Sequence, residues 1–204
     1  MIKDKRGGKN KLVTINPFKL GEEPSDYWIG YIGADGFLST KKYLIGLKSK
    51  DIDHMEKYKT FVGGNVKLRY EINTAGSNIG IVNFGNFDIY YHLLKLGITP
   101  RKSKTFKYDI PLNGHILRGH FDGDGSISQN RPKITTGSLN FKNQLIEYYD
   151  SLGIKYSVFE KGIDIWDIYV MKDSRLKFFQ LLYTNATIFL NRKYDKFAAL
   201  VSNN

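Results

Sequence analysis

The sequence predicts an α+β protein made of two similar halves within one chain. A motif occurs twice, as DYWIGYIGADGFLS at 26–39 and as HILRGHFDGDGSIS at 115–128. The segments that follow each copy also come in the same order. In addition, 41% of the 204 residues are hydrophobic, which is enough to form a core. Internal repeats of this kind indicate a duplicated fold, so we expect two pseudo-symmetric halves.

Each half predicts the order helix, strand, strand, helix, strand, strand, helix. A short strand and an amphipathic helix follow each motif. Two β-branched or aromatic segments come next, and a helical pattern closes each half. The later segments are KLRYEI, SNIGIVNF and FDIYYHLLKLGI in the first half, and YSVFEK, DIWDIYVM and SRLKFFQLLYTNATIFL in the second.

Breaks in this pattern divide the chain. Residues 1–24 form a basic leader, for which a solvated tail is the favoured interpretation over a specific binding arm. The first half covers residues 25–103, a linker covers 104–113, and the second half covers 114–204. Pro111 and Asn113 interrupt the linker, and Asn113 is expected to cap the next helix.

The composition indicates a polyanionic partner and excludes several classes of protein. Lys and Arg number 31 against 20 Asp and Glu, which gives a net charge of +11. The absence of cysteine excludes disulfides, a cysteine nucleophile and thiolate metal sites. No apolar run is long enough to span a membrane, and the N-terminal residues lack the apolar core of a secretory signal. We therefore expect an intracellular protein.

The repeated segment predicts a helix with an unusually small face. Each helix is expected to end at a glycine in the left-handed conformation, Gly36 and Gly125. Small residues stand four apart, and therefore on one face of each helix. Glycine in a helix costs about 1 kcal/mol relative to alanine, so its repeated presence indicates close approach of another helix. The expected helix interface comprises Gly30, Ala34, Gly119 and Gly123.

Asp35 and Asp124 each precede the glycine that ends the motif helix. If the two helices lie side by side and parallel, these carboxylates meet at the negative ends of two helix dipoles. Proximity and the dipoles both raise the pKa of a carboxyl group. A divalent cation with a preference for oxygen ligands, such as Mg²⁺, would balance this charge. Carboxylate-held Mg²⁺ beside a basic surface is typical of phosphodiester cleavage.

The motifs WIGYIGADG (28–36) and LRGHFDGDG (117–125) resemble those of the LAGLIDADG homing endonucleases. The resemblance extends over residues 25 to 200, and two motifs in one chain resemble the single-chain form of the family. It implies two αββαββα halves with the motif helices packed at their interface, and antiparallel, saddle-shaped sheets that lie along DNA. The expected protein is thus a monomer, a pseudo-dimer, bound to a double-stranded DNA target.

The resemblance also implies the metal site. The last motif acid of each copy, Asp35 or Asp124, would bind the divalent metal, and the backbone carbonyls of Gly33 and Gly123 are further candidates. Mg²⁺ is the expected cofactor, and Mn²⁺ or Ca²⁺ can occupy such a site. The earlier motif acid is present as Asp122 in the second copy only.

Basic and polar side chains are predicted around this centre. Lys193 and Lys102 follow the last helix of each half, and Lys48 lies on the second strand of the first half; we expect these lysines to assist catalysis. Strand residues that face the groove are expected to contact DNA. The DNA-contact candidates are Ser39, Lys41, Lys67, Arg69, Ser128, Asn130, Arg131, Lys133 and Arg192.

The predicted function is a Mg²⁺-dependent, site-specific double-strand DNA endonuclease, encoded in an intron, an intein or a free-standing gene. It would act in a bacterial or phage-infected cytoplasm, or in an organelle. The alternative on the same scaffold is a non-cleaving protein, either an intron RNA maturase or a DNA-binding regulator. An unrelated basic structural protein does not explain the paired motif.

Two other metal sites do not fit the sequence. An EF-hand loop beginning at Asp122 would need glycine at Ile127 and glutamate at Lys133. The four histidines have no zinc-site spacing and no cysteine partners.

Overall fold

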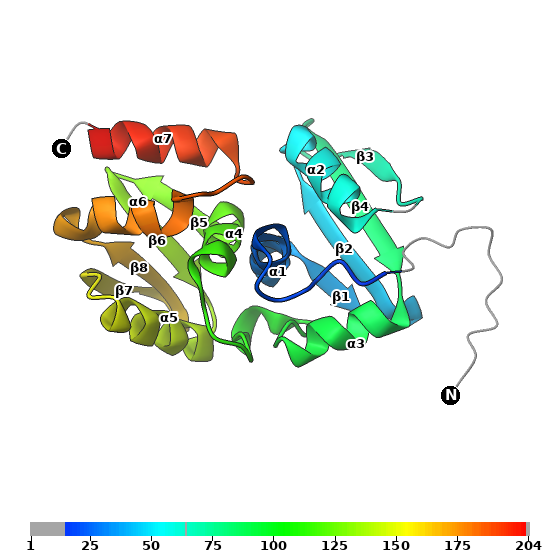
Figure 1. Cartoon of the computed structure of the whole chain (residues 1–204), viewed down its shortest axis with the longest axis horizontal. Coiled ribbons are helices and arrows are strands. Elements are labelled where there is room, and N and C mark those ends of the chain that lie inside the picture. The colour runs from blue at the N-terminus through cyan, green and yellow to red at the C-terminus, as the bar shows by residue number, and fades with distance from the viewer. Residues whose placement is uncertain (1–14, 64, 203–204) are drawn as a thin grey trace.

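The computed structural model describes residues 15–63 and 65–202, so the first 14 residues of the predicted leader lie outside the described residues. Two four-stranded antiparallel sheets flank a central pair of helices, α1 and α4 (Figure 1). The first half contains α1 (Glu23–Asp35), β1 (Phe37–Ser39), β2 (Leu44–Ser49), α2 (Ile52–Val62), β3 (Leu68–Ile72), β4 (Asn78–Gly85) and α3 (Phe87–Lys95).

The second half repeats this order and adds one helix. Its elements are α4 (Gly114–Asp124), β5 (Gly125–Ser128), β6 (Arg131–Thr136), α5 (Leu139–Ser151), β7 (Tyr156–Gly162), β8 (Ile165–Val170), α6 (Arg175–Tyr183) and α7 (Asn191–Ser202). The strand orders β1-β2-β4-β3 and β5-β6-β8-β7 correspond position by position. The predicted α+β fold of two pseudo-symmetric αββαββα halves is confirmed.

The last segment of the second half differs from the prediction. The pattern at 174–190 predicts one helix, but α6 ends at Tyr183 and α7 begins only at Asn191. Asn185 has φ of +58°, which turns the chain out of the helix. The intervening loop runs to α1, where Thr187 N and Ile188 N donate hydrogen bonds to Glu23. This tertiary contact overrides the local helical pattern.

The core extends through both halves and includes part of the predicted leader. Phe18 is fully buried and packs edge-on against Phe61 of α2, with ring centroids 5.3 Å apart. The linker also packs inward, because Phe106 and Tyr108 are buried. At its end, the Asn113 side chain accepts a hydrogen bond from Ile116 N, so the predicted helix cap is confirmed.

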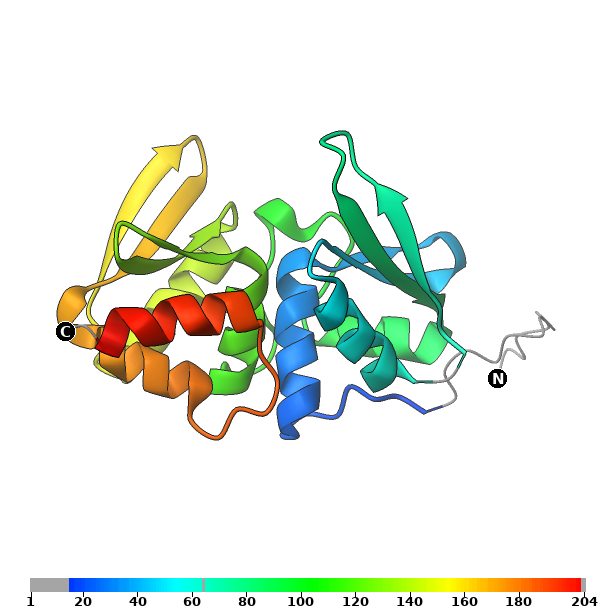
Figure 2. The same cartoon turned by 90° about the horizontal axis from the view of Figure 1, so that it is seen from above.

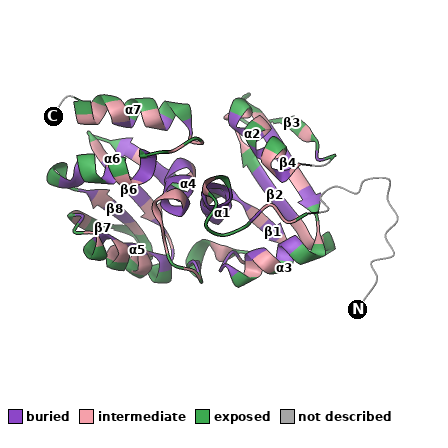
Figure 3. Cartoon of the chain, in the orientation of Figure 1, coloured by how far each residue is buried: buried purple, intermediate pink, exposed green. Residues whose placement is uncertain are grey.

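The β3–β4 and β7–β8 hairpins extend to the same side of the molecule, one on each side of α1 and α4 (Figure 2). The sheets thus form the two sides of a saddle over the helix pair. The middle of the helix pair is buried (Figure 3). No helix among the described residues is long and apolar enough to cross a bilayer.

Candidate active site at the ends of the motif helices

Helices α1 and α4 approach until backbone meets backbone. A Cβ atom on Gly30 would lie 2.0 Å from the Ile116 carbonyl oxygen, and one on Gly119 would lie 1.9 Å from the Tyr27 carbonyl oxygen. Further along, a Cβ on Gly123 would lie 2.4 Å from the Cβ of Ala34. These positions exclude any side chain larger than the ones present, so the small residues set the helix separation.

The two helices end at Asp35 and Asp124. The left-handed conformation predicted for the following glycines is wrong, because Gly36 and Gly125 have φ of −74° and −77°. Glycine is required there by space: a Cβ on Gly36 would lie 2.5 Å from Ile32 Cγ2, and one on Gly125 would lie 2.2 Å from Phe121 Cδ2. The chain therefore leaves each helix directly into a strand.

The two aspartates lie near one another at this end of the helix pair. The Asp35 carboxyl carbon is 3.5 Å from where a Cβ on Gly123 would stand, one residue before Asp124. Partial burial, followed by the charge of Asp35, raises the pKa of Asp124 to about 6. Burial likewise raises the pKa of Asp35, against the opposing effect of nearby lysines. The Asp124 side chain nevertheless stays 43% exposed, so it can reach a ligand.

Lys102 and Lys193 bind the ends of the two motif helices in equivalent ways. Lys102 Nζ donates to the carbonyls of Ala34 (3.1 Å) and Gly36 (2.6 Å) at the end of α1. Lys193 Nζ lies within hydrogen-bond distance of four carbonyls at the end of α4, those of Phe121 (2.7 Å), Asp122 (2.6 Å), Gly123 (3.1 Å) and Gly125 (2.6 Å). A cation at a helix C-terminus satisfies carbonyls that the helix leaves unpaired.

The lysines also act on the carboxylates across the interface. Among the lysines, Lys193 lowers the pKa of Asp35 most, and Lys102 lowers that of Asp124 most. Each aspartate is therefore balanced mainly by the lysine of the other half. Burial in turn lowers the pKa of Lys193 to about 8 and shifts that of Lys102 in the same direction. The two lysines thus oppose, but do not cancel, the rise in the pKa values of the two aspartates.

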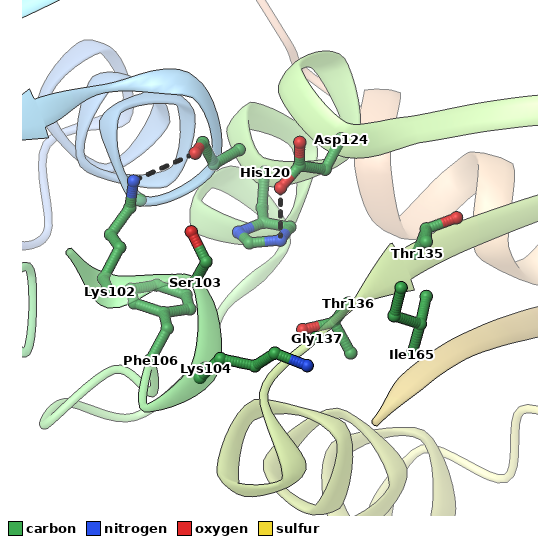
Figure 4. A pocket seen from close by; sticks show the side chains of 12 residues that line it. Lys102, Ser103, Lys104, Phe106, His120, Asp124, Thr135, Thr136, Gly137 and Ile165 are labelled. Carbon is green, nitrogen blue, oxygen red and sulfur yellow. Dashed lines mark hydrogen bonds and ion pairs between the residues drawn. The ribbon is translucent and has the colours of Figure 1, made fainter. Parts of the chain in front are cut away.

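A cavity of about 410 Å³ opens beside Asp124 (Figure 4). Its lining includes Lys102, His120 and Asp124, together with Thr135 on β6. His120 is buried, one helical turn before Asp124, and its Nε2 atom is 3.9 Å from Asp124 Oδ2. Burial and the two nearby lysines lower the pKa of His120 to about 3, so the imidazole is neutral.

Asp122, the earlier motif acid, points into the protein and away from this cavity. Its Oδ2 atom accepts hydrogen bonds from Tyr27 Oη (2.8 Å) and Leu190 N (2.7 Å), and burial raises its pKa to about 6. At the matching place in the first half, the Tyr108 hydroxyl fills the space beside Gly33. Asp122 is thus part of a buried hydrogen-bond network, which also includes His54 at 2.7 Å from Tyr27 Oη.

The carboxylate oxygens at this site suit a hard cation that keeps part of its shell of bound water. Among residues 15–63 and 65–202, no three His, Cys, Asp or Glu side chains converge as in an all-protein metal cage. One or two carboxylates, completed by water and substrate phosphate, are the usual protein ligands of Mg²⁺. The Gly123 carbonyl is contacted by Lys193, and the Gly33 residue lines the cavity.

Two predicted basic residues lie elsewhere. Lys48 pairs with Glu71 of β3 (3.3 Å), and both side chains are at least half exposed. Arg192 forms a bidentate ion pair with Asp51, with two contacts of 2.9 Å, and so links α7 to the start of α2 in the other half. The structure therefore places neither cation against the two aspartates by a direct contact.

Two DNA-contact candidates of the second half, Arg131 and Lys133, lie together on one face of its sheet. Arg131 lies over the Tyr169 ring, 4.5 Å from its centroid, and Lys133 pairs with Asp167. Asp167 also accepts a hydrogen bond from the Thr135 hydroxyl. Ser128 and Asn130 are exposed at the β5–β6 turn. Arg131, Lys133, Asp167 and Tyr169 thus form a polar cluster on this face of the second sheet.

The candidates of the first half are more dispersed. Arg69 of β3 is exposed and donates to the Asn83 side chain of β4, while Lys67 is exposed just before β3. Ser39 ends β1, and its hydroxyl accepts a hydrogen bond from Lys41 N (3.3 Å). Among its described residues, 15–63 and 65–103, no arginine–tyrosine stack like that of Arg131 and Tyr169 is found.

Sequence reasoning missed His120 and Tyr108 as neighbours of the site, and Asp51 as the partner of Arg192. His120 stands four residues before Asp124, which places it on the same helix face. That spacing was visible, but neither the approach of Tyr108 from the linker nor the contact between Asp51 and Arg192 has a local signal.

Comparison with known proteins agrees with this geometry. Residues 112–183 match the model of the LAGLIDADG-like domain. No curated protein sequence matches the chain significantly.

Solved structures resemble nearly the whole chain. I-DmoI in complex with DNA and Ca is 13% identical, with a TM-score of 0.61, and the match covers 92% of this chain and 100% of I-DmoI. The meganuclease I-SmaMI bound to uncleaveable DNA is 16% identical, with a TM-score of 0.55 and coverage of 92% and 89%. Full-length DUF199/WhiA from Thermatoga maritima is 12% identical, with a TM-score of 0.57 and coverage of 91% and 62%. The resemblance noted in the sequence is therefore confirmed: residues 112–183 match the LAGLIDADG-like domain, and the chain has the same fold as the homing endonuclease I-DmoI and the meganuclease I-SmaMI.

Proposed function

We propose that this protein is a site-specific double-strand DNA endonuclease that uses a divalent cation, with Mg²⁺ as the physiological metal. The observation that carries the proposal is the meeting of Asp35 and Asp124 at the ends of two glycine-packed helices, beneath two sheets that extend to one side. I-DmoI and I-SmaMI, which have this fold, were solved with DNA. A net charge of +11 supports a polyanionic substrate.

The chain's own residues would divide the work as follows. Asp35 and Asp124 would hold the cation through carboxylate oxygens, and the bound cation would polarise the phosphodiester and activate water. Lys102 and Lys193 fix the helix ends that carry these acids, since their ammonium groups donate to main-chain carbonyls. We therefore assign both lysines a positioning role, in addition to lowering the negative potential that a phosphate would meet.

The sheets would bind DNA by two kinds of contact. Arg131, held by stacking on Tyr169, presents a guanidinium suited to a base edge. Exposed cations such as Lys41 and Lys67 suit phosphates. Lys133 is held by Asp167, so it is less available for phosphate than its charge indicates.

A non-cleaving nucleic-acid-binding protein is the second candidate, and one observation favours it. Lys102 and Lys193 lower the pKa values of the two aspartates, so part of the charge that a metal would balance is balanced within the protein, although both pKa values stay raised. The fold match to DUF199/WhiA also shows that this architecture is not confined to proteins described as endonucleases. A maturase or a DNA-binding regulator would use the same sheets without cutting.

Cleavage of a defined DNA separates these functions. The substrate is duplex DNA that carries the insertion site next to the protein's own reading frame, with the intron or gene removed. Wild-type protein with Mg²⁺ should cut both strands, and Asp124→Asn should bind the same duplex without cutting it. Lys59→Met serves as a matched control, since its ion pair with Glu56 lies on α2 and has no contact with the aspartates, and we expect it to cut.

Three outcomes are informative. Cutting that disappears in Asp124→Asn with binding retained supports the endonuclease. Tight, specific binding of the duplex or of the intron RNA without cutting supports the non-cleaving alternative. Cutting that persists in both Asp35→Asn and Asp124→Asn would place the chemistry elsewhere in the protein.

A further inference from the structure

One buried nitrogen atom beside Asp124 has no hydrogen-bond partner. His120 is 2% exposed, and its Nε2 atom makes no hydrogen bond. The same atom faces Asp124 Oδ2 at 3.9 Å, and the residue lines the cavity that opens there (Figure 4). A buried polar atom without a partner is costly, so its position next to a carboxylate calls for an explanation.

The proton on the imidazole can be assigned from its other side. Tyr108 Oη lies 2.9 Å from His120 Nδ1 and 3.1 Å from the Gly30 carbonyl oxygen. The hydroxyl has one proton and a carbonyl oxygen can only accept. Both contacts are therefore hydrogen bonds only if Tyr108 donates its proton to Gly30 and accepts one from His120. Nδ1–H then donates to Tyr108 Oη, and both contacts are made. In this tautomer Nε2 carries a lone pair, which faces the Asp124 carboxylate.

The ring cannot turn away from this arrangement. Its centroid is 4.2 Å from that of Phe141, and it stacks on Phe106 at 5.7 Å with planes 15° apart. Packing on both aromatic rings and the contact to Tyr108 therefore fix the imidazole. The lone pair of Nε2 and the carboxylate oxygen of Asp124 repel one another unless a positively charged group lies between them. A histidine whose other ring nitrogen is held by a hydrogen bond is typical of a metal ligand.

We propose that His120 Nε2 is a ligand of the divalent cation held by Asp124, and that this ligand raises the affinity of the site for a transition metal such as Mn²⁺ relative to its affinity for Mg²⁺, whichever metal serves cleavage. The inference rests on the proposed function, because it concerns the same cation. Metal–nitrogen and metal–oxygen bonds of about 2.1 Å each span up to about 4.2 Å. The 3.9 Å between these two atoms lies within that span, so one ion can contact both.

The first half has no histidine at the corresponding position of its motif. The residue that corresponds to His120 in the repeated motif is Tyr31, also buried, and a neutral phenol is a poor ligand. An imidazole shifts the preference of a site from Mg²⁺ toward later divalent metals. The two carboxylates of the pseudo-symmetric site therefore differ, and only the side of Asp124 gains metal selectivity.

The test is pulsed electron paramagnetic resonance of Mn²⁺ bound to the full chain, without DNA. We expect nuclear modulation from a directly bound ¹⁴N in the wild-type protein. Growth with ¹⁵N-labelled histidine should replace it with the ¹⁵N frequencies, which identifies histidine without any substitution. His120→Gln should remove the modulation and weaken Mn²⁺ binding by about tenfold or more, with a smaller effect on Mg²⁺.

Controls separate this inference from the proposed function. His54→Gln, a buried histidine on α2 that contacts Tyr27, should retain the modulation. Mn²⁺ that binds, is lost in Asp124→Asn and shows no histidine nitrogen overturns the role of His120 and leaves the endonuclease proposal intact. Mn²⁺ that binds to the wild-type protein no better than to Asp35→Asn/Asp124→Asn overturns both. Modulation that survives in His120→Gln assigns the nitrogen to another histidine and also overturns the inference.

Discussion

The charged side chains around the site differ most in how far they are buried. This difference in burial determines how much each contributes to the free energy of unfolding. Lys193 is 7% exposed and bound to four carbonyls, whereas Lys48 is half exposed in a surface ion pair. We expect Lys193→Met to lower the free energy of unfolding by about 1–3 kcal/mol, because those carbonyls lose their donor. Lys48→Met should change it by less than about 0.5 kcal/mol. Urea denaturation at pH 7 measures both, and equal effects would contradict the structural role assigned to Lys193.

The buried carboxyl group of Asp122 makes the free energy of unfolding depend on pH. Burial raises its native pKa from 3.8 to about 6, so the native state binds more protons than the unfolded state between these values. Stability from this residue therefore falls as the pH rises from about 4 to 6. Relative to the wild type, Asp122→Asn should gain up to about 3 kcal/mol over that range. Denaturation series in EDTA at pH 4, 5 and 6.5 measure the difference, and a constant difference would show that Asp122 ionises freely.

At the scale of elements, the helix pair depends on the absence of side chains where α1 and α4 touch. A Cβ on Gly119 would lie 1.9 Å from the Tyr27 carbonyl oxygen. The atoms in contact are main-chain atoms, so a methyl group there would force the two helices apart. We expect Gly119→Ala to cost about 3 kcal/mol or more of stability. Gly162→Ala is the matched control, because nothing lies within 4 Å of its Cβ position. Thermal unfolding followed by circular dichroism should show a much lower Tm for Gly119→Ala only.

Local patterns were sufficient to predict the elements, but not the contacts between them. The order of helices and strands follows from hydrophobic periodicity. The helix pair was predicted from small residues four apart in each motif, Gly30 with Ala34 and Gly119 with Gly123. The break after Tyr183 could not be predicted, since it exists to bring Thr187 to Glu23, 164 residues away. The left-handed φ predicted for Gly36 was also wrong. Glycine is needed there because a side chain would clash with Ile32, and the local sequence does not show this.

The same limit applies to the candidate site. The motif places Asp35 and Asp124, because their positions at the helix ends are fixed by sequence. The partners of Lys48 and Arg192 depend on which strands and loops fold against them. His120 was visible in the motif, but its unpaired nitrogen follows only from the position of Tyr108 in the linker.

At the scale of the molecule, polar contacts hold the two halves together beside the helix interface. Asp51 and Arg192 connect α2 to α7, and Glu23 receives hydrogen bonds from Arg118 and the loop before α7. A double-mutant cycle of Asp51→Ala and Arg192→Ala should give a coupling of about 0.5–1 kcal/mol, since the arginine is partly exposed.

We expect one cooperative unfolding transition for both halves, because neither can expose its motif helix without losing this interface. Two separate calorimetric transitions would contradict this prediction.

The net charge of +11 sets how binding to nucleic acid responds to salt. Each phosphate contacted by a cation releases counterions from the duplex, so the logarithm of the binding constant falls linearly with the logarithm of salt concentration, with a slope of about −0.9 per contact. Some cations are already paired within the protein, as Lys133 is with Asp167 and Arg192 with Asp51, so the slope should reflect fewer contacts than the total charge allows. Lys67→Gln, which removes one exposed cation, should reduce the magnitude of the slope by about 1, whereas Arg192→Gln should leave it unchanged. Fluorescence anisotropy with a labelled duplex between 50 and about 300 mM salt measures these slopes. A flat response in the wild-type protein would exclude a phosphate backbone as the partner, whatever the fold.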